Sequence, residues 1–147
     1  MGWENKMTRE EKIEFLSRYK EIDYEINRLC EELSVWRARV TKITPTYSSQ
    51  PKGGQQEDQL QSAIEKIIEL EQEIDAEVDM LYKEKREIQR AILTVKDKTL
   101  RKLLLLKYIC KEKCSWDKIA IELGYTYRHV TRMHGMALDK LHIDSCP

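Results

Sequence analysis

Residues that build sheets and turns are scarce in this sequence. Only 7% of the 147 residues are aromatic, and the chain has five glycines and three prolines. Charged residues, by contrast, make up 35% of the chain, and Glu, Lys, Leu and Ile are common. This composition is typical of long helices rather than of sheet sandwiches, so we predict an all-α fold.

Long apolar runs are also lacking. No segment approaches the ~20 apolar residues that a membrane span needs, and no apolar segment of the secretory kind follows the first residues. The four cysteines, Cys30, Cys110, Cys114 and Cys146, are scattered without the spacing of a disulfide framework. We therefore expect a cytoplasmic protein with reduced thiols and no contact with a membrane.

Catalytic motifs are missing as well. The chain has no Walker loop, no His-Glu-x-x-His, no Gly-x-Ser-x-Gly and no dinucleotide fingerprint, so we expect neither an enzyme nor a cofactor. Metal-ligating residue types do occur toward the C-terminus, at Cys110, Cys114, His129, His134, His142 and Cys146. No pair of them has the two-residue spacing of a structural zinc site, and we expect no metal.

The zero net charge conceals an uneven distribution of charge. Residues 1–95 hold 15 Lys and Arg against 20 Asp and Glu, net −5, whereas residues 96–147 hold 11 against 6, net +5. Such asymmetry suggests that the basic part meets a polyanion and that the acidic part meets something else.

Two apolar seams occupy the acidic part. In the first, steps of four and three residues alternate through Phe15, Tyr19, Ile22, Ile26, Leu29, Leu33, Trp36, Val40 and Ile43. In the second, the same steps run through Leu60, Ile64, Ile67, Glu71, Ile74, Val78, Leu81, Lys85, Ile88, Ile92 and Val95. A 3.5-residue repeat keeps one stripe of a helix against a partner, which predicts coiled-coil packing.

Between the seams we predict a loop over about residues 44–59, because Pro45, Pro51 and the glycine pair that follows favour turns. Two seams of similar length around one loop predict a long antiparallel helical hairpin over residues 1–95. A two-helix hairpin leaves the flanks of its seams exposed. We therefore also expect a homo-oligomer that forms through this coiled-coil arm.

The register of the hairpin makes one contact predictable. If Ile43 lies near Leu60, the lysine stem of Lys85 lies near the Tyr19 ring, where a cation–π contact can form. The alternative interpretation is that Lys85 and Glu71 are tolerated polar residues of the seam that fix the register of the two helices.

Short helices are predicted in the basic part, residues 96–147. The segment Leu100–Cys110 is apolar on too many faces for a surface helix, so we expect it to be buried. A second helix is predicted for Trp116–Leu123, with Ser115 as its N-cap and Gly124 just past its end.

A third helix, Tyr127–Leu141, is predicted to begin after a cap at Thr126 and to bury Val130, Met133, Ala137 and Leu141. Two helices joined by a glycine turn, with the small Ala120 where they cross, match the helix-turn-helix pattern. In that pattern the second helix enters the major groove of DNA.

The segment SWDKIAIELGYTYRHVTRMHGMALDKL, residues 115–141, resembles region four of sigma-70 factors, down to its closing Ala-Leu-x-Lys-Leu. Nearly the whole chain, including the Thr44-Pro45 and Pro51-Lys-Gly-Gly54 signature, also resembles phage and prophage sigma-like regulators of the RinA and ArpU late-transcription activator kind. The resemblance implies a phage protein in a bacterial host cell. It would bind a promoter or operator and activate late genes together with host RNA polymerase.

The residues expected to read DNA bases are Tyr127, Arg128, Thr131 and Arg132, which face away from the apolar side of the third helix. They fall where region four places its base-reading residues, and an arginine can bond guanine O6 and N7 at once. Tyr127 stands where region four usually carries a charged residue. The promoter sequence therefore cannot be carried over from the family.

Phosphate contacts are expected at the start of the second helix and just before it. Helix N-termini and ammonium groups both attract anions. The residues concerned are Ser115, Trp116, Lys118, Lys111 and Lys113.

Two other functions also fit the sequence. A phage small terminase subunit combines a helix-turn-helix with helical oligomerisation, although its DNA-binding unit usually comes first in the chain. A region-four mimic would instead bind RNA polymerase with its basic part rather than DNA. Steep salt dependence of binding to duplex DNA would favour a DNA-binding protein over a protein that binds RNA polymerase through a mainly apolar contact.

Overall fold

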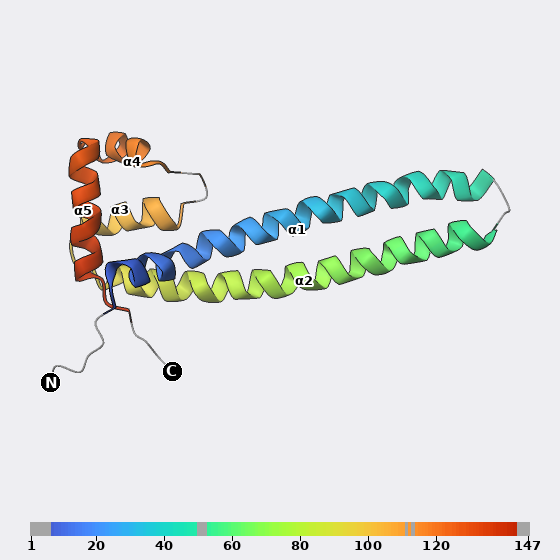
Figure 1. The fold of residues 1–147 in the computed structure, drawn as a ribbon, viewed down its shortest axis with the longest axis horizontal. Coiled ribbons are helices and arrows are strands. Elements are labelled where there is room, and N and C mark those ends of the chain that lie inside the picture. The colour runs from blue at the N-terminus through green and yellow to red at the C-terminus, as the bar shows by residue number, and fades with distance from the viewer. Residues whose placement is uncertain (1–6, 50–52, 111, 113, 144–147) are drawn as a thin grey trace. The chain divides into compact units, whose positions relative to one another are not determined.

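The computed structural model describes residues 7–49, 53–110, 112 and 114–143. Within these residues every regular element is a helix, in the order α1 Arg9–Ser49, α2 Gly53–Leu93, α3 Lys98–Tyr108, α4 Trp116–Leu123 and α5 Tyr127–Lys140 (Figure 1). The predicted all-α class is confirmed. No helix in this described part of the chain has the length and apolar content needed to cross a membrane.

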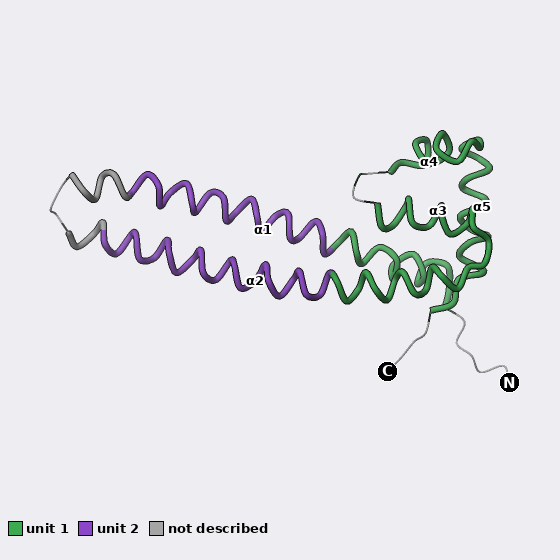
Figure 2. The backbone as a smooth tube through the Cα atoms, turned by 180° about the vertical axis from the view of Figure 1, so that it is seen from behind, with its two compact units in different colours: residues 1–21, 82–147 green, residues 22–81 purple. Residues whose placement is uncertain are grey.

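The chain divides into two compact units, which Figure 2 colours separately. Unit 1 holds the residues up to Glu21 and those from Tyr82 onward, and unit 2 holds Ile22–Leu81. Both long helices therefore contribute to both units, and the basic C-terminal helices share unit 1 with the start of α1 and the end of α2. The domain boundary at residue 95 stays a prediction.

The helices α1 and α2 pack against each other as an antiparallel pair. In unit 2 the Arg37 guanidinium lies 3.0 Å from a carboxylate oxygen of Glu71. In unit 1 the Lys85 ammonium lies 5.8 Å from the centroid of the Tyr19 ring. The contact between Lys85 and Tyr19 was predicted from the register of the hairpin, and the structure confirms it.

The predicted loop over residues 44–59 is wrong in extent. Helix α1 continues through Pro45 to Ser49, and α2 begins at Gly53. Residues 50–52 lie outside the described part of the chain. A proline inside a helix removes one hydrogen bond, but each further residue of an already formed helix adds one, so turn-favouring residues need not end it.

The predicted second seam is shifted in unit 2. Ala63 and Leu70 are buried there, whereas Ile64 is 43% exposed and Glu71 is exposed. A small apolar cluster forms from buried Leu29, Leu33 and Leu70, with Trp36, Ile67 and Ile74 packed against it. Ile67 and Ile74 belong to the predicted seam and also to the observed one. The observed seam contains Ala63 and Leu70 in place of Ile64 and Glu71, so α1 packs on a side of α2 that leaves Glu71 in water.

Unit 1 holds the larger apolar core. Its fully or almost fully buried side chains come from all five helices and from the segments that follow α2 and α5: Leu16, Ile88, Ile92, Val95, Leu103, Leu104, Ile119, Val130, Leu138 and Leu141. The first predicted C-terminal helix, Leu100–Cys110, is found two residues earlier as α3. Its N-cap is Asp97, whose carboxylate accepts hydrogen bonds from the amides of Thr99 and Leu100 at 2.9 and 3.2 Å.

Candidate functional site

Local hydrogen bonds fix the turn between α4 and α5. Gly124 ends α4 with φ +77°, a left-handed conformation that strains any residue with a Cβ atom. The amides of Gly124 and Tyr125 both donate to the carbonyl of Ala120 at 2.9 Å. Thr126 then caps α5, because its hydroxyl accepts from the His129 amide at 3.1 Å. The predicted stop at Gly124 and cap at Thr126 are confirmed.

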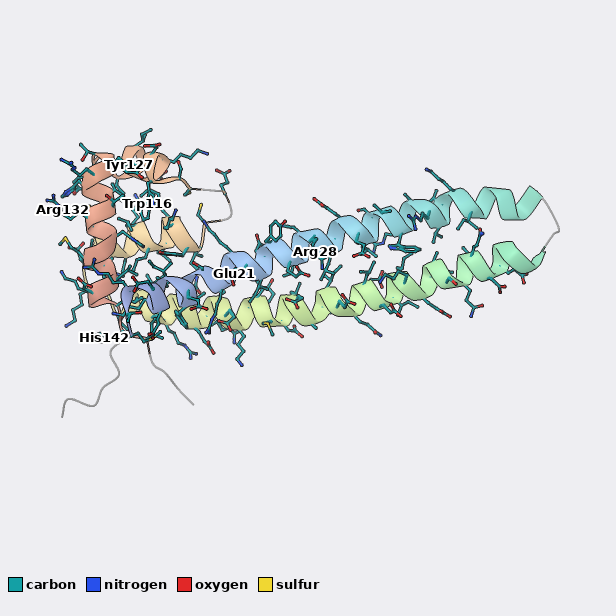
Figure 3. The ribbon with its side chains drawn as sticks, in the orientation of Figure 1. Glu21, Arg28, Trp116, Tyr127, Arg132 and His142 are labelled. Atoms are coloured by element: carbon teal, nitrogen blue, oxygen red, sulfur yellow. The ribbon has the colours of Figure 1, made fainter. Side chains whose placement is uncertain are left out.

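Helix α5 has one buried side and one exposed side. The buried side consists of Val130, Met133, Ala137 and Leu138. Three of the four predicted base-reading residues are exposed, since Tyr127 is 53% exposed and Arg128 and Arg132 are open to solvent. In Figure 3, Arg132 lies on the side of α5 that faces away from α3.

The fourth predicted base-reading residue, Thr131, is only half-exposed. Its hydroxyl donates to the backbone carbonyl of Arg128 at 2.9 Å. The hydroxyl proton is therefore already used within the helix, and the oxygen is left as an acceptor. Thr131 shares the face of Arg128 because side chains three residues apart are neighbours on a helix.

The predicted phosphate-binding residues lie around the start of α4. Ser115 is exposed, and its hydroxyl caps α4 by accepting from the Lys118 amide at 3.3 Å, as predicted. The Lys118 side chain is exposed. Lys111 and Lys113 lie outside the described residues.

Trp116 is placed differently from the other predicted contacts. It is half-buried, and Figure 3 shows it between α4 and α3. Its ring lies edge-on to His134 with centroids 4.7 Å apart, and the Lys107 ammonium lies 4.4 Å from its centroid. Packing between helices uses much of this ring. A direct part for it in binding stays a prediction.

His134 is the centre of a polar cluster behind the exposed face of α5. Its Nε2 lies 2.6 Å from the Tyr108 hydroxyl, a hydrogen bond whose donor depends on the imidazole tautomer. Burial, with further effects of Lys107 and Arg9, lowers the pKa of His134 to about 4. Burial also raises the pKa of Tyr108 to about 12. Both side chains are therefore uncharged near neutral pH.

Acid is expected to destabilise unit 1 through His134. The unfolded imidazole titrates near pH 6.5, above its pKa of about 4 in the fold, so the unfolded chain binds the proton more tightly. The stability contribution is complete above pH 6.5 and is lost as the pH falls toward 4. The full shift corresponds to about 3 kcal/mol, and partial exposure reduces this to roughly 1 to 2 kcal/mol.

The measurement is the free energy of unfolding by denaturant between pH 7 and pH 4, followed by circular dichroism. His134→Gln keeps a polar side chain that does not titrate, so its stability should change less over this range. Equal slopes for the two proteins would show that His134 does not couple stability to pH.

Contacts with the start of α1 hold the C-terminal end of α5, a link that no sequence pattern indicated. Nε and Nη2 of Arg9 donate to the two carboxylate oxygens of Asp139 at 2.8 and 2.6 Å. The Lys12 ammonium donates to the Leu138 carbonyl at 2.7 Å, which gives a partner to a carbonyl at the helix end. The hydrogen bond from Arg9 lowers the pKa of Asp139.

An aromatic pair also stands at the start of α5. The rings of Tyr125 and His129 are 4.8 Å apart between centroids, and both residues are exposed. The two rings are tilted by 56° and add exposed aromatic surface just before and within the first turn of α5. Only the four-residue spacing could have suggested it from the sequence.

Titratable side chains do not gather into a metal site in the described residues, where no group of three or more His, Cys, Asp or Glu is arranged to hold an ion. Cys30, Cys110 and Cys114 are free thiols. Compared with known proteins, the chain matches no family model, no curated protein and no solved structure. The resemblance to sigma-like regulators rests on the motif residues alone.

Proposed function

We propose that the chain is a sequence-specific DNA-binding regulator of transcription and that α5 is its recognition helix. The observation that carries the proposal is the exposed side of α5. Two arginines and a tyrosine project there within two turns, opposite a side whose Val130 is fully buried. A rigid helix with a cationic, hydrogen-bonding face is what direct reading of base edges requires.

The dimensions of a helix support the major groove as the binding site. With its side chains an α-helix is ~10 to 12 Å across, and the major groove of B-DNA is about 12 Å wide. Arg128 and Arg132 are four residues apart, so one groove can receive both guanidinium groups. Each can bond guanine O6 and N7 at once, and the planar guanidinium holds its two donors in a fixed geometry that a flexible lysine lacks.

Contacts with the DNA backbone would come from the start of α4. Ser115 and Lys118 stand there, and backbone amides at the beginning of a helix favour phosphate. Such contacts position a protein on the duplex without reading its sequence. The basic balance of residues 96–147, net +5, gives the same part of the chain a general attraction to a polyanion.

The finer parts of the proposal rest on the resemblance of residues 115–141 to sigma region four. These parts are the activation of phage late genes, the partnership with host RNA polymerase and the setting in a bacterial cytoplasm. Homo-oligomerisation through the helical arm rests instead on the thin core of unit 2, where buried residues are few.

One observation favours a second candidate, binding to RNA polymerase by the region-four-like part itself. Ile121 on α4 is 82% exposed, and Tyr125 after the same helix is 44% exposed. Exposed apolar side chains that form a contiguous patch often mark a protein contact. A contact of that kind depends on apolar burial and responds weakly to salt.

Salt titration of DNA binding tests the proposal. Duplexes are selected from a random pool, and their affinity for the full chain is measured by fluorescence anisotropy over a range of salt concentrations. The affinity should fall steeply as salt rises, because lysines and arginines that neutralise phosphates release bound counterions. No binding to duplex DNA at low salt would overturn the proposal.

A further inference from the structure

A groove in unit 1 is not used by the proposed reading of DNA. It lies along the end of α2 and along α3, has a volume of about 580 Å³ and is lined by Gln89, Ile92, Leu93, Lys98, Arg101, Lys102 and Leu105. Its apolar side chains are open to solvent, with Leu93 65% exposed and Leu105 39% exposed. Exposed leucines on either side of one groove are typical of a surface that is covered by a partner.

The charge of the groove has one sign. Three of its seven lining residues are basic, and none is acidic. Nε of Arg101 is buried and has no hydrogen-bond partner among the described residues, and its Nη2 makes only a long contact, 3.4 Å, with the Lys96 carbonyl. Three basic side chains beside two exposed leucines suit an occupant that brings carboxylates together with apolar side chains.

The chain itself carries a helix with these properties. Residues 57–81 of α2 contain nine Asp and Glu against a single lysine. Ile64 and Ile68 in this stretch are 43% and 48% exposed. Spacings of four and seven residues place Ile64, Ile68 and Asp75 on one face of the helix. This acidic isoleucine face, defined by those three residues, lies outside the small apolar cluster of unit 2.

We propose that the groove of one copy of the chain binds the acidic isoleucine face of a second copy. The two isoleucines cover Leu93 and Leu105, and carboxylates of the second copy's α2 meet Lys98, Arg101 and Lys102. The carboxylates also pair with the charge of the Arg101 guanidinium, and a guanidinium bonds carboxylates well. The contact joins two different surfaces, so it is heterologous and either closes into a ring or continues as a chain of molecules.

A mixing experiment tests this contact. Leu93→Glu places a carboxylate in the basic, apolar groove, and Ile68→Glu removes an apolar side chain from the face. Both positions are about half exposed or more, so the helices should persist, as circular dichroism would verify. Met80→Glu is the matched control, because Met80 is 51% exposed on the same helix but on its opposite side.

Sedimentation velocity of the full chain should show self-association at micromolar concentration that weakens as salt rises. Leu93→Glu and Ile68→Glu should each weaken it by roughly tenfold or more, and Met80→Glu should not. Mixing the first two variants should restore a complex, since one keeps an intact face and the other an intact groove.

Three results would overturn the proposal. The first is a chain that stays monomeric at these concentrations. The second is association that Ile68→Glu weakens while Leu93→Glu does not, which is the pattern of symmetric pairing between two arms. The third is a mixture of the two variants that remains dissociated. DNA binding by α5 is measured separately, so either proposal can fail without the other.

Discussion

Replacing Arg128 or Arg132 by alanine is expected to weaken binding to a selected duplex by about 1 to 3 kcal/mol, roughly 5- to 150-fold, without changing helix content. Both side chains are exposed, and neither contributes to the core that Val130 and Leu138 build beneath α5. The loss should depend on the sequence of the duplex, because a guanidinium that bonds a guanine edge discriminates between bases.

The substitution to lysine separates charge from base reading. Arg132→Lys keeps the positive charge but loses the planar pair of donors, so binding should become less specific while its salt dependence changes little. Arg86→Ala is the matched control, because Arg86 is an exposed arginine on α2. Affinity and footprint on the selected duplex are the measurements. Unchanged affinity and footprint in both alanine variants would remove α5 as the reading helix.

Leu104→Ala is expected to lower the free energy of unfolding by about 2 to 5 kcal/mol, the range found when a buried leucine is cut back to alanine. Leu104 is fully buried in α3, and the cost combines lost apolar burial with the cavity that remains. Such a loss is a large fraction of the stability of a small protein.

The neighbouring residue supplies the comparison. Leu105 belongs to the same run of four leucines but is 39% exposed, so Leu105→Ala should cost much less. Denaturant unfolding followed by circular dichroism measures both. Equal costs for the two variants would mean that α3 does not turn Leu104 toward the core and Leu105 toward solvent. The pair thus tests the packing of unit 1 without reference to DNA.

Features set by neighbouring residues were predictable from the sequence. Ser115, Gly124 and Thr126 were assigned to helix ends from residue type and position, and each has that part in the structure. The reason is physical. A cap depends on a side chain and an amide two or three residues away, and a left-handed turn depends on a missing Cβ atom.

Packing between helices was predictable only in part. Apolar spacing identified the helix pair, but the placement of Ile64 and Glu71 in the second seam was wrong, because Ala63 and Leu70 are buried there instead. An isoleucine fits the apolar spacing, but a small alanine also fits well where two helices approach closely. Once Ala63 and Leu70 face the partner, Glu71 is no longer a defect in the seam and can pair with Arg37.

Contacts between distant parts of the chain could not be predicted. Arg9 and Asp139 are 130 residues apart, and either could have had many partners of opposite charge among the 52 charged residues. Trp116 was assigned to the candidate DNA surface because it stands at a helix start. Its rotation toward His134 and Lys107 depends on where α3 and α5 lie, which no local pattern encodes.

The bonds from Arg9 and Lys12 to the end of α5 also bear on how the chain is made in the cell. A ribosome adds ~5 to 20 residues per second, so roughly 6 to 26 s pass between the synthesis of Arg9 and that of Asp139. Until α3, α4 and α5 have been made, Leu16 and its apolar neighbours lack part of the core that later covers them. The nascent chain is then most prone to aggregation, and binding by a chaperone would protect it most at this stage.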